Sequence, residues 1–447
     1  MRDPGRLTDM KFYSTNQRSP QVSFRDAVIQ GMPADNGLYM PVSIPEVNSN
    51  FIRKLPKMKM QEIAYILSKI WLNEDFPDNL LKEIAYDAFD FEAPLHQVDE
   101  NIYSLELFHG PTFAFKDFGA RFMARTLSHL QQNEDQETVI LVATSGDTGS
   151  AVANGFLNVP GIYVVLLYPG GMVSDLQEKQ ITTLGKNITA LEIKGTFDDC
   201  QMLVKQAFMD EDLNDIMRLT SANSINIARL LPQSFYYFYA YGQVAELNKP
   251  VIFSVPSGNF GNLCGGLLAK KMGLPVKKFI APTNANNIFP NYIKTGKFEP
   301  KSSQKTISNA MDVGNPSNFP RIQEIYNNNY SQITKDIESQ AYSDFITKKT
   351  IRNVFEKTNY LLCPHSAIAY LGIHDSLLDN EGDITGIFLS TAHPAKFYNV
   401  INDFLEIEIP FPSELKSVMN LKKESIKMES DYTELKEFLI SADWRKN

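Results

Sequence analysis

The chain has 447 residues, of which 43% are hydrophobic and 21% charged, and its formal net charge is −9. This length predicts two or three domains, and the composition is ordinary for a globular protein. The negative charge and the lack of a Lys/Arg run argue against a nucleic-acid surface, and no segment reaches the ~20 apolar residues of a membrane-spanning helix.

The cysteines Cys200, Cys264 and Cys363 are far apart, and none belongs to a Cys-x-x-Cys motif. They predict neither a disulfide framework nor a cysteine zinc site, and they favour a reducing compartment, so we expect a cytoplasmic protein. No His-x-x-x-His helix pair occurs, so no metal site is expected. The stretch that begins at Met10 is typical of a natural start, which would make residues 1–9 an extension.

The first predicted elements are helices. Apolar residues recur at helical spacing in residues 22–32, 59–72 and 78–89, which read "VSFRDAVIQGM", "KMQEIAYILSKIWL" and "DNLLKEIAYDAF". These runs predict a helical N-terminal domain over residues 10–98.

From residue 99 onward, β-branched runs of strand length alternate with amphipathic helices. The clearest runs are "TVILVAT", "GIYVVLLYP", "NITALEIKG", "KPVIFSVPS", "VKKFIAPT" and "ITGIFLSTA". Such apolar runs are typical of strands buried on both faces of a parallel sheet, so the sequence predicts an α/β fold with parallel sheets flanked by helices. We expect a discontinuous large domain, 99–136 with 212–447, and a small α/β domain, 137–211.

A single lysine, Lys116, lies among phenylalanines in "ELFHGPTFAFKDFGARF". Lysine is strongly hydrated and is rarely placed among aromatic rings unless its ammonium is paired or its amine has a chemical role. An apolar setting made by Phe113, Phe115 and Phe118 would lower the lysine pKa and favour the neutral, nucleophilic amine. The alternative is a helix-start lysine that reaches out to water.

In doubly wound sheets, ligands bind beyond the carboxyl ends of the strands, so the loops after the predicted strands are the places to look for a site. The loop in "SVPSGNFGNLCGG" joins a buried strand to a helix, and its glycines let backbone N–H groups converge beside the helix N-terminus. This arrangement suits a phosphate group. A tight turn whose glycines serve only packing is the alternative.

Three further loops follow predicted strands. Residues 144–149 offer N–H and hydroxyl donors suited to a carboxylate, and residues 223–229 could hold a second anion through Arg229. Thr391 follows a buried strand directly, so its hydroxyl could point into a cleft. Each loop by itself also fits a plain structural role, such as a capped helix, a surface arginine or a strand-end threonine. Together with the phosphate loop and the lysine, they fit pyridoxal phosphate bound to Lys116 as a Schiff base.

Several ordered motifs support this interpretation. They are "QVSFRDAVIQG", "LELFHGPTFAFKDFGARF", "ATSGDTGSAVA", "SANSINIARLLPQ", "SVPSGNFGNLCGGLLAK", "SNAMDV", "CPHSAIAY" and "STAHPAKF". In this order the chain closely resembles the threonine synthase family over nearly its whole length from Met10. The resemblance implies the fold of the tryptophan-synthase-β group (fold type II) of pyridoxal phosphate enzymes, preceded by a helical domain.

The resemblance also implies roles for individual residues. Lys116 would be the catalytic Schiff-base lysine, and Thr391 would meet the pyridine nitrogen. The cofactor phosphate would lie on Ser257, Gly258, Asn259, Phe260, Gly261 and Asn262. Substrate would be held by Thr144, Ser145, Asp147, Thr148, Asn223, Ser224 and Arg229, the last three at its phosphate. Related enzymes have asparagine where this chain has Asp147, so the contact of Asp147 is left open.

The implied reaction converts O-phospho-L-homoserine and water to L-threonine and phosphate by γ-elimination and β-addition of water. One alternative is a phospho-lyase that releases 2-ketobutyrate, and another is a catalytically retired paralogue that only binds. The expected partner is this small-molecule substrate, with no nucleic acid and no membrane, and the protein is expected to be a monomer or a small homo-oligomer.

Overall fold

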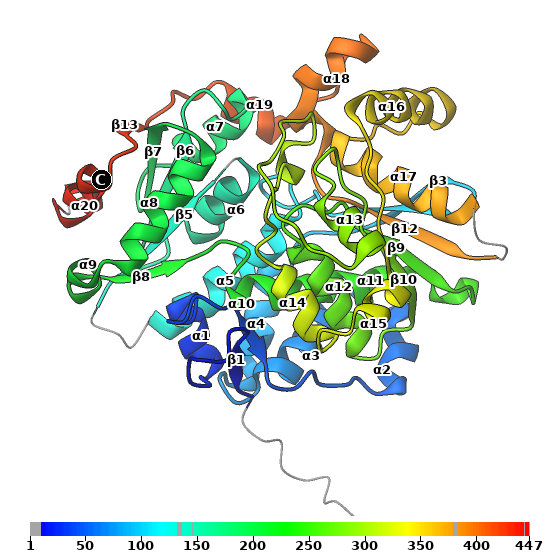
Figure 1. Cartoon of the computed structure of the whole chain (residues 1–447), viewed down its shortest axis with the longest axis horizontal. Coiled ribbons are helices and arrows are strands. Elements are labelled where there is room, and N and C mark those ends of the chain that lie inside the picture. The colour runs from blue at the N-terminus through cyan, green and yellow to red at the C-terminus, as the bar shows by residue number, and fades with distance from the viewer. Residues whose placement is uncertain (1–9, 132–135, 145, 379–382, 442, 447) are drawn as a thin grey trace, which may run out of the picture.

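The computed structural model describes residues 10–131, 136–144, 146–378, 383–441 and 443–446. Figure 1 shows two large sheets, one of five strands in the left half of the view and one of six strands in the right half. Helices flank both sheets, so the predicted α/β fold is confirmed. Within the described ranges, no helix is both long and apolar enough to span a bilayer.

The N-terminal segment is helical, as the sequence predicts. Its elements are β1 (Phe12–Ser14), α1 (Phe24–Gln30), β2 (Tyr39–Pro41), α2 (Ser49–Lys54), α3 (Met60–Leu72) and α4 (Asp78–Ala88). The two strands pair antiparallel, and α1, α3 and α4 fall in the three predicted helical runs. Helix α3 buries Ile63, Leu67 and Trp71, four residues apart, so one face of it packs against the rest of the protein.

The later helices alternate with the strands of the two sheets. They are α5 (Lys116–Gln131), α6 (Asp147–Phe156), α7 (Asp175–Thr182), α8 (Phe197–Met209), α9 (Glu211–Ile216), α10 (Ile227–Leu230), α11 (Phe235–Val244), α12 (Gly261–Lys271), α13 (Ile288–Thr295), α14 (Phe319–Ile325), α15 (Tyr330–Asp336), α16 (Asp344–Thr358), α17 (Pro364–Leu378), α18 (Tyr398–Leu405), α19 (Ser413–Met419) and α20 (Tyr432–Ser441).

The six-stranded sheet has the order β11-β10-β9-β12-β4-β3 and is parallel except for β3, which pairs antiparallel with β4. Its strands are β3 (Leu95–Asp99), β4 (Ile102–Glu106), β9 (Val251–Ser254), β10 (Val276–Ile280), β11 (Ile337–Glu338) and β12 (Thr385–Ser390). Ile387 and Leu389 pack with the core that contains α11 and α12, whereas Phe388 packs with α17. Both faces are therefore covered, as the apolar runs predict.

The five-stranded sheet is parallel throughout and has the order β13-β7-β6-β5-β8. Its strands are β5 (Thr138–Ala143), β6 (Ile162–Pro169), β7 (Ile188–Lys194), β8 (Arg218–Ser221) and β13 (Ile426–Glu429). Strands β8 and β13 lie beyond the predicted boundary at residue 212, yet they pair here because β5 and β7 offer them free edges. Strand β3, assigned to the N-terminal domain, pairs in the six-stranded sheet. The three-domain division itself stays a prediction.

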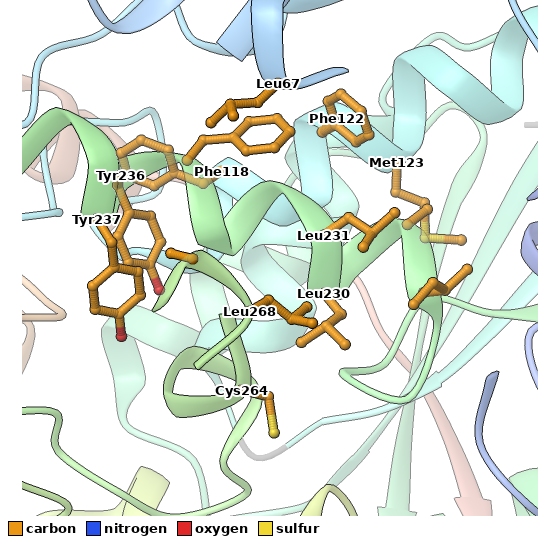
Figure 2. Packing of buried hydrophobic residues seen from close by; sticks show 14 of the residues in the cluster. Leu67, Phe118, Phe122, Met123, Leu230, Leu231, Tyr236, Tyr237, Cys264 and Leu268 are labelled. Atoms are coloured by element: carbon orange, nitrogen blue, oxygen red, sulfur yellow. The ribbon is translucent and has the colours of Figure 1, made fainter. Parts of the chain in front are cut away.

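Helix α5, which begins at Lys116, is fixed by a dense aromatic core (Figure 2). Phe118 and Phe122 of α5 lie beside Leu67 of α3, and the Phe118 ring lies 5.4 Å from the ring of Tyr236 on α11. Edge-on aromatic pairs of this kind add to the stabilisation from buried area. The lysine is thus carried by a helix that packing holds in place.

The predicted site loops all follow strands at their carboxyl ends. Residues 107–115 connect β4 to α5, residues 144–146 connect β5 to α6, and residues 255–260 connect β9 to α12. Residues 222–226 follow β8, and Thr391 follows β12. Because the carboxyl ends of parallel strands lie at one edge of a sheet, these loops are the natural walls of a ligand site.

Candidate active site

Lys116 borders a cavity that is walled by loops from both sheets. The Phe115 N–H donates to the Thr391 carbonyl at 2.9 Å, so the start of α5 is joined to the end of β12. Of the three phenylalanines predicted around the amine, Phe115 lies 6.0 Å from the Lys116 nitrogen. Phe118 instead packs in the main hydrophobic core, and Phe113 packs against a separate hydrophobic cluster that contains Phe397.

Burial lowers the pKa of Lys116 to about 8, against an ordinary value of 10.5. Asp147 opposes this shift, and the positive charges of Lys396 and Arg229 add to it. A lysine with this pKa has an appreciable neutral fraction near pH 7, which a nucleophile or a base requires. The chemical role predicted for the amine therefore agrees with its surroundings.

The cavity brings together loops that are far apart in the sequence. The predicted site residues that line it are Lys116, Thr148, Ser224, Arg229, Gly258, Asn259, Phe260, Gly261, Asn262 and Thr391. Four others, Thr144, Asp147, Asn223 and Ser257, are not part of its lining. Ser145 lies outside the described residues.

The loop between β9 and α12 has the geometry of a phosphate cradle. The Asn262 amide donates to the Pro256 carbonyl at 3.0 Å and closes the loop on itself. Phe260 has a positive φ of 62° at the residue before α12, a conformation that is uncommon for a bulky side chain. Helix α12 points its N-terminus at the cavity, so the helix dipole favours an anion there.

Replacing Gly258 by alanine is expected to weaken cofactor binding by about 10- to 100-fold, because overpacking of this kind typically costs about 1–3 kcal/mol. An added Cβ would lie 2.7 Å from the Ala310 carbonyl oxygen and 3.0 Å from the Met311 Cα, both of which are backbone atoms. Titration of the cofactor-free protein with pyridoxal phosphate, followed by absorbance, measures the loss. Gly261→Ala is the comparison, because its Cβ would meet nothing nearer than 3.4 Å. Equal losses in the two variants would contradict the steric explanation.

Arg229 forms a second cationic wall of the cavity. Its side chain is buried, and it has no ion pair within the described parts of the chain. Its Nη1 donates to the Ala222 carbonyl, while its Nε has no hydrogen-bond partner among the described atoms. Burial lowers the pKa of Arg229 to about 10, which still leaves it charged at neutral pH. A buried guanidinium without an ion-pair partner among the described residues, and with an unpartnered Nε–H, suits an anionic ligand.

The loop after β5 is organised differently from the prediction. The Thr144 hydroxyl accepts hydrogen bonds from the N–H groups of Gly146 and Gly149, at 3.0 and 2.8 Å, so it braces the loop. Asp147 forms a buried ion pair with Lys396, with 2.7 Å between Oδ1 and Nζ. The adjacent Thr148 lines the cavity. The contact of Asp147 that the sequence left open is therefore with another side chain of the protein.

Sequence reasoning missed three residues at the site. Lys396 was visible in "STAHPAKF" but was given no role. His365 lines the cavity; its Nε2 accepts a hydrogen bond from the Ala310 N–H, and its Nδ1 has no partner among the described atoms. Arg321 is fully buried and donates to the carbonyls of Ser224 and Ile225, so it holds the loop after β8 in place. The one sequence signal for Lys396 and His365 is that they lie in the motifs "STAHPAKF" and "CPHSAIAY".

The residues present fit pyridoxal phosphate. The cofactor needs an amine for its aldehyde, an anion cradle for its phosphate and a polar group near its ring nitrogen. The chain offers the Lys116 amine, a glycine loop that a single Cβ would crowd, and Thr391 in the same cavity. The unpartnered donors on Arg229 and His365 leave hydrogen bonds to be made by a ligand.

Comparison with known proteins agrees with this geometry. Residues 90–388 match the family model described as pyridoxal-phosphate dependent enzyme. Residues 11–89 match threonine synthase N terminus, and residues 366–439 match threonine synthase, C-terminal. Together these matches cover the helical N-terminal segment, both sheets and most of the C-terminal region.

Relatives of known name match nearly the whole chain. The threonine synthase of Haemophilus influenzae is 46% identical over 97% of this chain and 100% of its own. The solved threonine synthase of Escherichia coli superimposes with a TM-score of 0.90 at 43% identity over 97% of this chain and 100% of its own. The pyridoxal-phosphate-bound threonine synthase of Brucella melitensis has a TM-score of 0.92 at 32% identity over 98% and 100%. The fold type II architecture is thereby confirmed, and the chain belongs to the threonine synthase family of pyridoxal-phosphate-dependent enzymes.

Proposed function

We propose that this enzyme converts O-phospho-L-homoserine and water to L-threonine and phosphate. The observation that supports the proposal best is that one cavity contains Lys116, a glycine loop suited to a phosphate, and a buried guanidinium. The glycine loop lies at the start of α12 and is bordered by Ser224, and the guanidinium is that of Arg229. A phosphorylated cofactor and a phosphorylated substrate require two phosphate-binding groups, whereas an enzyme that acts on an unphosphorylated amino acid requires one.

Lys116 removes the α-proton in this proposal. When bound, pyridoxal phosphate supplies an electron sink for the charge left behind on removal of a proton. The Lys116 nitrogen would hold the cofactor and, when free, would be placed to act as the base that takes the α-proton. The burial that lowers its pKa to about 8 keeps enough of the free amine neutral for this step.

Arg229 and Ser224 hold the leaving group. The departing phosphate carries about two negative charges, and a guanidinium already buried in the cavity can offset part of that charge without reorganisation. Thr391 would be the residue that meets the ring nitrogen, and the backbone around Thr148 at the start of α6 would receive the substrate carboxylate, since both residues line the cavity.

The products decide between this function and its competitors. The purified enzyme, incubated with pyridoxal phosphate and O-phospho-L-homoserine, is expected to release threonine and phosphate in equal amounts. Phosphate released together with 2-ketobutyrate would support the phospho-lyase instead. No product from an enzyme that binds the cofactor would support a retired binding paralogue.

The enzyme acts on a small molecule, and we propose a cytoplasmic monomer or small homo-oligomer. Cys200, Cys264 and Cys363 are all free thiols, and all are buried. Unpaired cysteines of this kind are typical of proteins from reducing compartments, which supports the proposed location.

A further inference from the structure

The ion pair between Asp147 and Lys396 is enclosed by protein. The Lys396 side chain is fully buried, and the Asp147 side chain is 6% exposed. Lys396 also donates to the Thr112 carbonyl at 2.9 Å, and the Gln177 amide donates to Asp147 Oδ1 at 2.9 Å. Burying two charges is costly unless they are paired and hydrogen-bonded, and here both conditions are met.

The pair joins two walls of the active site. Asp147 is the first residue of α6, and the next residue, Thr148, lines the cavity. Lys396 lies in the short helix Pro394–Phe397, just after Thr391. A change in the pair would therefore act on the cavity walls that carry Thr148 and Thr391.

Both charges of the pair act on Lys116, and they act in opposite directions. Burial is the main cause of the low pKa of Lys116; Asp147 raises that pKa, and Lys396 lowers it. Burial opposes ionisation of Asp147, but Lys396 and Lys116 outweigh it and hold the pKa of the Asp147 carboxyl well below its ordinary value. With both partners present, their effects on Lys116 oppose each other.

The other titratable groups around the pair do not replace either partner. Arg229 on α10 lowers the pKa of Lys116 but forms no ion pair with Asp147. His365 on α17 is buried, which lowers its pKa to about 4 and leaves it neutral. Burial raises the pKa of Asp117 on α5 to about 6, and its carboxylate accepts two hydrogen bonds from Thr112. Near neutral pH, Lys396 is thus the direct counter-charge of Asp147.

We propose that Lys396 is a positioning residue whose ammonium cancels the charge of Asp147 beside Lys116. The loop after β5 then keeps an ionised carboxylate without drawing a proton onto the Lys116 nitrogen and without repelling the substrate carboxylate. This inference rests on the proposed role of Lys116. It goes further by naming the group that sets the charge of the site.

The test uses the holoenzyme in three variants: Lys396→Met, Asp147→Asn, and the two combined. The visible absorbance of bound cofactor, followed from pH 6 to pH 11, reports protonation of the Lys116 nitrogen. Removal of Lys396 is expected to raise the titration midpoint by about one pH unit or more, and removal of Asp147 is expected to lower it. The double variant is expected to return close to wild type and to recover at least about ten-fold in kcat over Lys396→Met.

A merely structural ion pair would give a different pattern. Both single variants would then lose thermal stability while their midpoints stayed fixed or moved in the same direction, and either result would overturn the proposal. If Lys396→Met does not fold, Asp147→Asn and the double variant still decide the question, because only the former should shift the midpoint downward. A wild-type enzyme without cofactor absorbance that depends on Lys116 would instead overturn the proposed function.

Discussion

Replacing Lys116 by alanine is expected to abolish the visible absorbance of bound cofactor and to lower kcat by about 10⁴-fold or more. The covalent attachment and the α-proton transfer both depend on this amine, and general acid–base catalysis alone typically contributes about 10²- to 10⁴-fold. No other lysine lines the cavity within the described residues. Absorbance spectra of the purified variant and an assay of phosphate release provide the two measurements.

Two further variants separate chemistry from folding. Lys116→Arg retains a positive charge but offers no nucleophilic amine at neutral pH, so it should be as inactive as Lys116→Ala. Lys422→Ala changes an exposed lysine far from the cavity and should behave as wild type. A variant at position 116 that stays coloured and is not bleached by borohydride would show that the cofactor is held in another way.

Arg229→Met is expected to lower kcat/KM for the phosphorylated substrate by about 10²- to 10³-fold, with little loss of stability in the ligand-free protein. Removing a preorganised cation from an anion site commonly costs this much in transition-state stabilisation. The free energy of unfolding should change by less than about 2 kcal/mol, because loss of the hydrogen bond to the Ala222 carbonyl is offset by relief of a buried, unpaired charge. Steady-state kinetics and urea unfolding measure the two effects.

The matched control for Arg229 is Arg352→Met, which changes an exposed arginine on α16. It should leave kcat/KM unchanged. Should Arg229→Met retain full kcat/KM, the assignment of the substrate phosphate to this wall would be wrong. A fall in stability as large as the loss of activity would instead point to a structural role.

The sequence by itself determined the features that depend on short stretches of chain. Apolar runs such as 138–144 and 384–392 specify strands buried on both faces, because no charged residue interrupts them. The glycine loop before α12 and the start of α5 at Lys116 each lie within a short stretch of chain. Since each feature lies within a short stretch of chain, the sequence predicted that the glycine loop follows a buried strand and that Lys116 lies at the start of a helix.

Only the tertiary structure decided which distant segments meet. The pairing of β8 and β13 in the five-stranded sheet depends on which strand edges are free, and the local pattern of a strand does not carry that information. The partner of Asp147 lies in a helix near the other end of the chain, and a carboxylate can pair with any cation that the fold brings near. Arg321 likewise donates to the carbonyl oxygens of Tyr39 and Ile225, which lie far apart in the sequence. Long-range contacts of this kind fix the charge of the site, because burial and pairing exist only after the chain has folded.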